Sequence, residues 1–219
     1  MQLDRPLQVV TPTVDGAVLA ALARADSYFT GRGVHQLVGR YSAEGVRRAL
    51  ERLVGQGIVE VMAAGPSKLY RLNRDHLAAP HIAALASLRE EFIDRLRLRL
   101  AGWSIPPAYA ALFGSAAAGD MRSDSDIDVF VVRPHGVPGD DESWAEQLEQ
   151  LAHDGSRWTG NDLRIFEMSE ADARLGSVGD EQVLSDIRER GIRLAGPATY
   201  LRGRSAAKGA AASRLSRGG

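Results

Sequence analysis

The sequence predicts an α+β protein with two domains: a small helical domain with a hairpin, followed by a domain built on a small mixed sheet. In residues 10–75, segments with helical periodicity precede two short strand-like runs. In residues 104–196, apolar β-branched runs alternate with helical segments instead. A chain of 219 residues is long enough for one large or two small domains.

Composition excludes several classes of function. The formal net charge is -1, so nucleic-acid binding would have to come from local basic patches. Cysteine is absent, which excludes a disulfide framework and a thiolate zinc site. No apolar run approaches the roughly 20 residues of a membrane span, and the N-terminus shows no signal-peptide pattern. We therefore expect a cytoplasmic protein without a membrane partner.

The first domain is expected to contain three helices and a hairpin. Ser42 stands at the N-cap position of the third helix, because its side chain is suited to accept a backbone hydrogen bond there. Gly65 and Pro66 mark the turn of the hairpin. The expected elements are helices at 14–25, 33–38 and 42–57, and strands at 58–62 and 68–72.

This order of elements resembles a winged helix-turn-helix. The stretch SAEGVRRALERLVGQG, residues 42–57, is similar to the recognition helix of bacterial transcription regulators, and GIVEV with KLYRLN is similar to their wing. In that family the recognition helix enters the major groove. The resemblance implies double-stranded DNA as a partner, with contacts from Tyr41, Arg47, Arg48 and Lys68. The alternative is a protein-interaction domain in which these arginines only solvate a helix face.

Residues 76–103 are predicted to form a connecting helix. Apolar residues recur at helical spacing from Ile82 to Leu100. Two roles remain open for this helix. It joins the domains or forms the seam of a homodimer, or it packs on the sheet of the second domain.

The second domain is organised around two strands and the segment between them. An apolar run ends at Phe113, and a Gly114-Ser115 corner follows, which suits phosphate binding. Asp126 and Asp128 then enter another apolar strand. Residues i and i+2 of a strand share a face, so the two carboxylates point the same way. Paired hard oxygen ligands suit Mg²⁺, which usually binds one or two carboxylates together with substrate phosphates.

The pattern of Gly114-Ser115, Gly119 and Ser125-Asp126-x-Asp128 resembles the DNA polymerase beta-like nucleotidyltransferases, especially the minimal and kanamycin-type branch. The resemblance implies two Mg²⁺ ions, held by three carboxylates, and transfer of a nucleoside monophosphate from a triphosphate, with ATP expected, to a hydroxyl acceptor. It assigns Asp126 and Asp128 as catalytic metal ligands. Nucleotide binding falls to Gly114, Ser115, Gly119 and Ser125.

The third carboxylate has two candidates, Asp162 and Glu167. The helix between the Asp126 strand and the next strand indicates a parallel crossover, so both strands begin at the same edge of the sheet. Asp162 stands at that edge, whereas Glu167 lies five residues along, roughly 16 Å away at about 3.3 Å per residue. Geometry therefore favours Asp162 as the third catalytic and metal-binding residue.

The rest of the chain supplies helices at 143–153 and 180–190, a turn-rich stretch at 154–161, and a closing strand at 192–196. Residues 202–219 are basic and rich in Ala, Gly and Ser, and we expect a disordered tail. Two functions follow. One is a nucleotidyltransferase that also binds DNA, as an antitoxin-like autoregulator would. The other is a transcription regulator with a degenerate, nucleotide-sensing domain. Three acceptors stay open: an antibiotic, a protein tyrosine or an RNA 3′ end.

Overall fold

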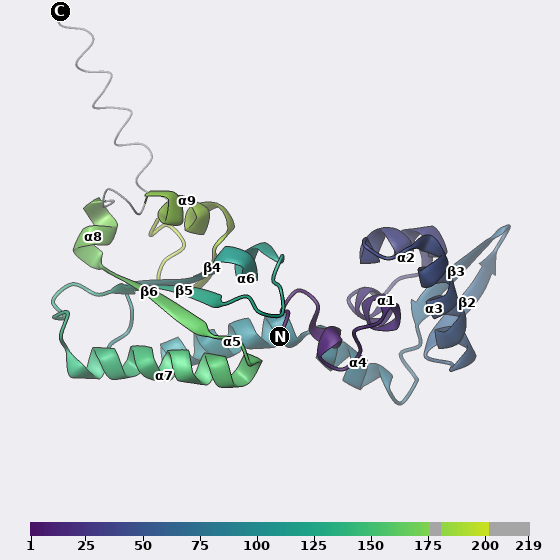
Figure 1. The fold of residues 1–219 in the computed structure, drawn as a ribbon, viewed down its shortest axis with the longest axis horizontal. Helices are drawn as coiled ribbons and strands as arrows, with labels where there is room; N and C mark the ends of the chain where they lie inside the picture. Colours follow the sequence, from purple (N-terminus) through teal and green to yellow (C-terminus); the bar gives the residue numbers. More distant parts are fainter. Residues whose placement is uncertain (176–180, 202–219) are drawn as a thin grey trace, which may run out of the picture. The chain divides into compact units, whose positions relative to one another are not determined.

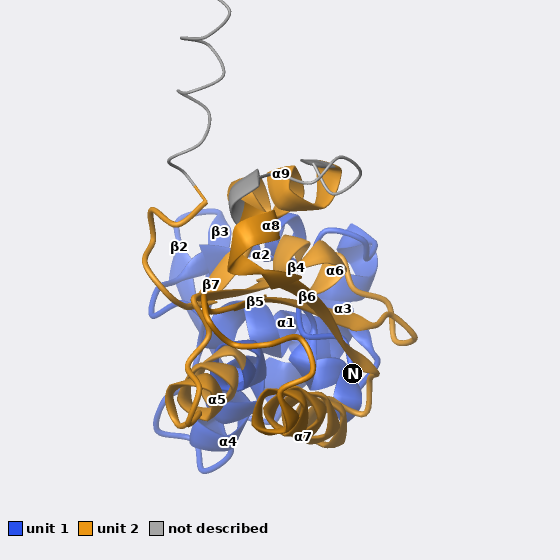
Figure 2. Cartoon of the chain, turned by 90° about the vertical axis from the view of Figure 1, so that its left-hand side faces the viewer, with its two compact units in different colours: residues 1–92 blue, residues 93–219 orange. Residues whose placement is uncertain are grey.

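The structure is a computed structural model that describes residues 1–175 and 181–201 (Figure 1). It divides into two compact units, Met1–Phe92 and Ile93–Gly219 (Figure 2). The predicted basic tail, 202–219, lies outside the described residues, as does Asp180 at the start of a predicted helix. In the described part of the chain, no helix is both long enough and apolar enough to cross a lipid bilayer.

The N-terminal unit combines helices with a small antiparallel sheet. Its strands lie in the order β1-β3-β2. The Ser42 hydroxyl accepts a hydrogen bond from Gly45 N at 3.1 Å, which confirms the predicted N-cap. The elements are η1 Pro6–Val9, α1 Val14–Ala23, β1 Phe29–Thr30, α2 Gly31–Val38, α3 Ala43–Gly55, β2 Val59–Ala64, β3 Ser67–Leu72 and α4 Ala79–Ala86.

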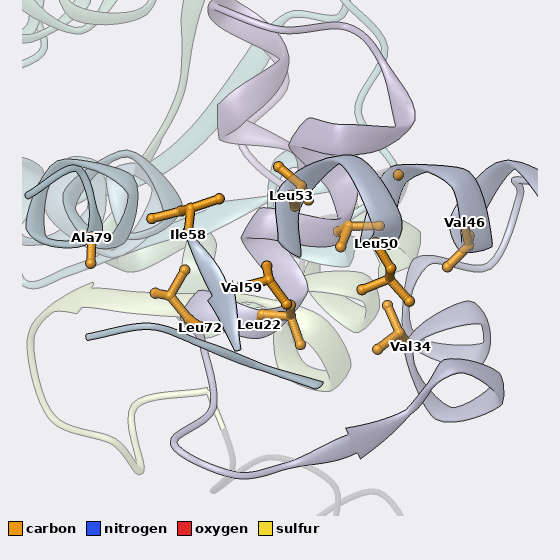
Figure 3. Close-up of a cluster of buried hydrophobic side chains, with 11 residues drawn as sticks. Leu22, Val34, Val46, Leu50, Leu53, Ile58, Val59, Leu72 and Ala79 are labelled. Atoms are coloured by element: carbon orange, nitrogen blue, oxygen red, sulfur yellow. The ribbon is translucent and has the colours of Figure 1, made fainter. Parts of the chain in front are cut away.

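One apolar core holds this unit together (Figure 3). Helix α3 contributes Val46, Leu50 and Leu53, which share one face because they are three or four residues apart. They pack with Leu22 of α1 and Leu72 of β3, both fully buried. Burial of such side chains contributes about 1.5–3 kcal/mol each, so this cluster fixes how the helices lie on the sheet.

The C-terminal unit is built on a mixed sheet with strand order β6-β5-β4-β7. Strand β4 is antiparallel to both of its neighbours, β5 and β7. Strands β5 and β6 are parallel, which confirms the predicted crossover. The strands are β4 Tyr109–Phe113, β5 Ile127–Arg133, β6 Leu163–Ser169 and β7 Ile192–Ala195.

Helices cover both faces of this sheet (Figures 1 and 2). Helices α5, Leu88–Ala101, and α7, Glu142–Thr159, lie on one face. Helices α6, Gly114–Ala118, α8, Glu170–Leu175, and α9, Glu181–Arg190, lie on the other. Phe130 and Val132 of β5 pack in the same buried cluster as Leu184 and Ile187 of α9. Alternation along β5 therefore places Asp126 and Asp128 on the α6, α8 and α9 face.

The predicted connecting helix is two helices, α4 and α5, separated at Ser87. The Ser87 hydroxyl donates to Ala83 O at 2.9 Å, and its N–H reaches the carbonyls of both Ala83 and Ala84. The apolar periodicity continues through this break, so the sequence pattern did not reveal it. From Ile93 onward α5 belongs to the C-terminal unit, where Arg99 forms an ion pair with Asp154 of α7 at 2.9 Å. The boundary between the two units falls inside α5, and Arg97 of α5 donates to Arg193 O of β7 at 3.3 Å. The homodimer seam stays a prediction.

Helix α7 is longer than the sequence indicated. The predicted turn-rich stretch is mostly helix, and α7 ends at Thr159 with Gly160 in the left-handed conformation, φ 74°. Gly155 lies inside this helix, and its lack of a side chain allows α7 to approach β6 closely. A Cβ built at this position would lie 2.1 Å from Leu163 Cδ1.

Candidate active site

Two carboxylates lie side by side where β5 begins. Asp126 directly precedes the strand and Asp128 is its second residue. In the sheet, Asp128 pairs with Phe113 of β4 and with Arg164 of β6. Asp128 therefore lies on an interior strand of the sheet, near the end where β5 begins. Its partner on β4, Phe113, directly precedes the Gly114-Ser115 corner.

The Gly114-Ser115 corner lies against Asp128. Gly114 begins α6 with φ +65°, a conformation that favours glycine. A Cβ built on it would lie 2.7 Å from Asp128 Oδ2, so only glycine leaves room for the carboxylate. The half-buried Ser115 has no side-chain hydrogen bond within the described residues. Gly119, also left-handed at φ 79°, ends α6.

Burial and charge act together on Asp128. Partial burial raises the pKa of its carboxyl group above the usual range, and the negative charge of Asp126 raises it further. The Arg164 guanidinium acts in the opposite direction on this pKa. A site that accumulates negative charge in a partly desolvated position is one that a cation would stabilise.

Arg164 lies in the site but is not among the residues predicted from the sequence. Its Nη1 lies 2.6 Å from Asp126 Oδ2, and its Nε donates to Asp162 Oδ2 at 3.2 Å. One guanidinium thus bridges two of the three carboxylates predicted to bind metal. Arg164 follows Asp162 by two residues, so strand alternation puts both on one face, and this was the available signal in the sequence.

The two candidates for the third carboxylate lie in different places. Asp162 precedes β6 at the same sheet edge as Asp126, and its carbonyl accepts a hydrogen bond from Ile127 N at 2.8 Å. Glu167 accepts from Trp144 Nε1 of α7 at 2.9 Å and forms an ion pair with Arg133 at 3.1 Å. Glu167 is therefore engaged at the other end of the strands, while the catalytic role of Asp162 stays a prediction.

The side chains fit Mg²⁺ in part. Asp126 and Asp128 supply the two hard oxygen donors that Mg²⁺ commonly takes beside substrate phosphates. No group of three Asp, Glu, His or Cys side chains in the described ranges is arranged to hold a metal ion. Arg164, bonded to both Asp126 and Asp162, occupies the position of a counter-ion between them.

Ser125, predicted to bind nucleotide, has a local structural contact. Its hydroxyl accepts a hydrogen bond from Arg122 N at 2.9 Å, which closes the loop before Asp126. The carbonyl of Ser125 accepts from Asn161 Nδ2 at 2.9 Å. Asn161 is a second residue that the sequence analysis overlooked, since nothing in its local pattern indicates a bond to a loop 36 residues away.

The residues predicted to bind DNA lie on the N-terminal unit, but the two arginines are neutralised. Arg47 and Arg48 both donate to Glu44, and this lowers the pKa of the Glu44 carboxyl group to about 2. Arg47 also pairs with Glu51. Tyr41 is half-buried. Lys68 is exposed on β3 without an ion pair to any described residue.

A Gly-Ser corner at the end of β4, beside two aspartates at the start of β5, is the arrangement that the resemblance to nucleotidyltransferases implies. Comparison with family models supports it. Residues 91–167 match the family model described as nucleotidyltransferase domain, which is about a third of the chain. A comparison with curated proteins found no match.

Solved structures with partial likeness include toxin–antitoxin complexes. A crystal structure of a toxin–antitoxin with AMP-PNP shares 20% identity over 57% of this chain and 88% of the other, at a TM-score of 0.37. A second structure is of a tri-AMPylated Shewanella oneidensis HEPN toxin in complex with MNT antitoxin. Its sequence identity is 18%, the match covers 58% of this chain and 92% of the other, and the TM-score is 0.34. At these TM-scores the likeness assigns no role to any residue of this chain.

Proposed function

We propose that the C-terminal unit is a Mg²⁺-dependent nucleotidyltransferase that moves a nucleoside monophosphate from ATP, or another nucleoside triphosphate, to a hydroxyl acceptor. The observation that carries this proposal is the close approach of Gly114, in the Gly114-Ser115 corner, to Asp128, whose charge is coupled to that of Asp126. This approach supports the proposal, because a turn suited to phosphate and two carboxylates suited to Mg²⁺ lie near one point of the sheet edge.

The reaction requires little covalent chemistry from the protein. The acceptor oxygen forms a bond to the α-phosphorus, the bond from that phosphorus to the bridging oxygen breaks, and pyrophosphate leaves. Bound Mg²⁺ would neutralise charge on the attacking and leaving oxygens. Asp126 and Asp128 would hold it, and the Ser115 hydroxyl would donate to a phosphate oxygen.

Asp162 is the proposed third carboxylate. It lies at the same edge as the pair and would accept the proton of the acceptor hydroxyl or complete the metal site. To do either, its carboxylate must be released by Arg164, which bonds it in the structure. We propose that nucleotide and metal replace this contact.

Transfer of label tests the proposal. The protein is incubated with Mg²⁺ and each nucleoside triphosphate labelled at the α-phosphate, together with whole-cell protein and RNA as acceptors. We expect transfer by the wild type, loss with Asp126→Asn, and retention with Asp124→Asn. Asp124 is an exposed acid of the same loop, so it is a matched control.

One outcome of this experiment favours the alternative function. Binding of a nucleoside triphosphate without transfer to any acceptor would indicate a degenerate, nucleotide-sensing domain in a regulator. Transfer at wild-type level by both Asp126→Asn and Asp128→Asn would refute the proposed metal ligands.

For the N-terminal unit we propose binding to double-stranded DNA. Three helices followed by the antiparallel β2–β3 hairpin, with Lys68 exposed on β3, support this proposal. The ion pairs of Arg47 and Arg48 with Glu44 reduce the positive charge available to phosphates. We therefore expect weak affinity that falls steeply with salt.

A further inference from the structure

The loop that carries Asp126 is tied to the corner between α7 and β6. Asn161 lies in this corner, directly before Asp162, and is only 5% exposed. Its side-chain amide donates to Ser125 O at 2.9 Å and to Ser123 O at 3.3 Å. Its backbone N–H donates to the Thr159 hydroxyl at 3.2 Å, which fixes the corner itself.

We propose that Asn161 is a positioning residue that holds the Asp126 carboxylate in place relative to Asp128 and Asp162. The proposal rests on the proposed function for its catalytic meaning, but the tether itself rests on geometry alone. The amide is bonded to the carbonyl of the residue directly before Asp126. Any drift of this loop therefore moves Asp126, while Asp128 stays fixed within the ladder of β5.

The corner controls two of the proposed ligands together. Asp162 follows Asn161 directly in the chain, and Asp162 O accepts from Ile127 N, directly after Asp126, at 2.8 Å. The Asn161 side chain adds two bonds on the other side of Asp126. The two chain neighbours of Asp126 are thus each hydrogen-bonded to one of two consecutive residues of the corner, Asn161 and Asp162.

Two hydrogen bonds between Ser125 and Arg122 shape the loop but do not anchor it to the sheet. Ser125 Oγ accepts from Arg122 N, and Ser125 N donates to Arg122 O at 3.2 Å. Both bonds are internal to the loop, so they set its shape without fixing it to the sheet. Ser123, Asp124 and Arg122 are exposed, and packing does not hold them. The buried Asn161 amide supplies the missing anchor.

The test compares Asn161→Leu, which keeps most of the side-chain volume but removes both donors, with Ser156→Ala. The Ser156 hydroxyl accepts from Leu163 N at 3.0 Å, so this control weakens the same α7–β6 corner without touching the loop. Asn161→Ala is the second variant if Asn161→Leu fails to fold. Urea unfolding of the full chain measures how much stability each variant loses.

Amide hydrogen exchange is the first readout, and it does not depend on any activity. We expect exchange at Arg122, Ser125 and Ile127 to accelerate in Asn161→Leu and to remain as in the wild type in Ser156→Ala. Equal exchange at these amides in Asn161→Leu and wild type would overturn the tether, whatever the enzyme does.

Metal affinity is the second readout, measured with Mn²⁺ by electron paramagnetic resonance. Loss of groups that orient metal ligands typically lowers affinity 10- to 100-fold, so we expect a loss on the order of tenfold in Asn161→Leu and less than about twofold in Ser156→Ala. Unchanged Mn²⁺ affinity in Asn161→Leu would overturn the positioning role. Absence of Mn²⁺ binding by the wild type would instead overturn the proposed function, and the positioning role with it.

Discussion

Replacing Arg164 by Met tests whether its guanidinium occupies the place of the metal. Met keeps an unbranched apolar stem like that of Arg but lacks the guanidinium group that contacts Asp126 and Asp162. If cation binding must first break these contacts, the free energy of the contacts reduces the free energy of metal binding. Arg164→Met should therefore bind Mg²⁺ more tightly than the wild type does.

The structure limits the size of this effect. The Arg164 side chain is 63% exposed and that of Asp126 32%, so solvent screens the pair. Exposed ion pairs contribute up to about 1 kcal/mol, which corresponds to about a fivefold change in dissociation constant. Removing a positive charge beside the bound cation also lowers the dissociation constant for Mg²⁺. We expect the dissociation constant for Mg²⁺ to fall by up to about fivefold.

The assay is competition of Mg²⁺ against Mn²⁺, followed by electron paramagnetic resonance. It is run at pH 8, because loss of Arg164 removes the charge that lowers the pKa of Asp128. Arg122→Met is the matched control, since Arg122 is an exposed arginine of the nearby loop without an ion pair to any described residue. An affinity for Mg²⁺ that is unchanged or weaker in Arg164→Met would refute the reasoning.

Three further predictions concern stability and DNA. Gly114→Ala should destabilise the fold by at least about 1–2 kcal/mol in urea unfolding, because Ala is strained at φ +65° and its Cβ would meet Asp128; an unchanged midpoint would contradict this. The folded-state pKa of Asp128 is raised, so its ionisation costs stability as pH rises through that value. Asp128→Asn should therefore have a higher Tm than the wild type at pH 7, with the difference shrinking as pH falls through the folded pKa and vanishing below the unfolded pKa of about 4; the opposite trend would refute the pKa shift. Arg47→Ala with Arg48→Ala should weaken duplex binding in fluorescence anisotropy and reduce the salt slope by about one for each phosphate that the variant no longer neutralises. Lack of duplex binding by the wild type at low salt would leave the N-terminal unit as a protein-interaction domain.

The sequence predicted those features of the site that depend on local pattern. Alternation along a strand placed Asp126 and Asp128 on one face, and the crossover rule predicted the parallel pairing of β5 and β6. The crossover rule and the rise per residue of a strand separated Asp162 from Glu167, which have different partners in the structure. Their roles in catalysis are still predictions.

What the sequence could not supply depends on long-range contacts. The bridge made by Arg164 depends on the conformation of a long side chain between two strands, and Asn161 bonds a loop 36 residues away. Gly155 was taken as a turn residue, since its tight packing against Leu163 exists only after α7 and β6 have met. Similarly, the resemblance of residues 42–57 to a recognition helix implied DNA contacts from Arg47, but its pairing with Glu44 and Glu51 cancels much of its charge.

The central claim is that Asp126 and Asp128 support transfer of the α-phosphoryl group with its nucleoside. The most direct measurement compares ATP labelled at the α-phosphate with ATP labelled at the γ-phosphate, in the presence of Mg²⁺ and cellular acceptors. We predict that the α-label appears on an acceptor, that the γ-label is released as pyrophosphate, and that Asp128→Asn abolishes both while Asp124→Asn does not. Appearance of the γ-label on the acceptor, or undiminished α-label transfer by Asp128→Asn, would contradict the claim.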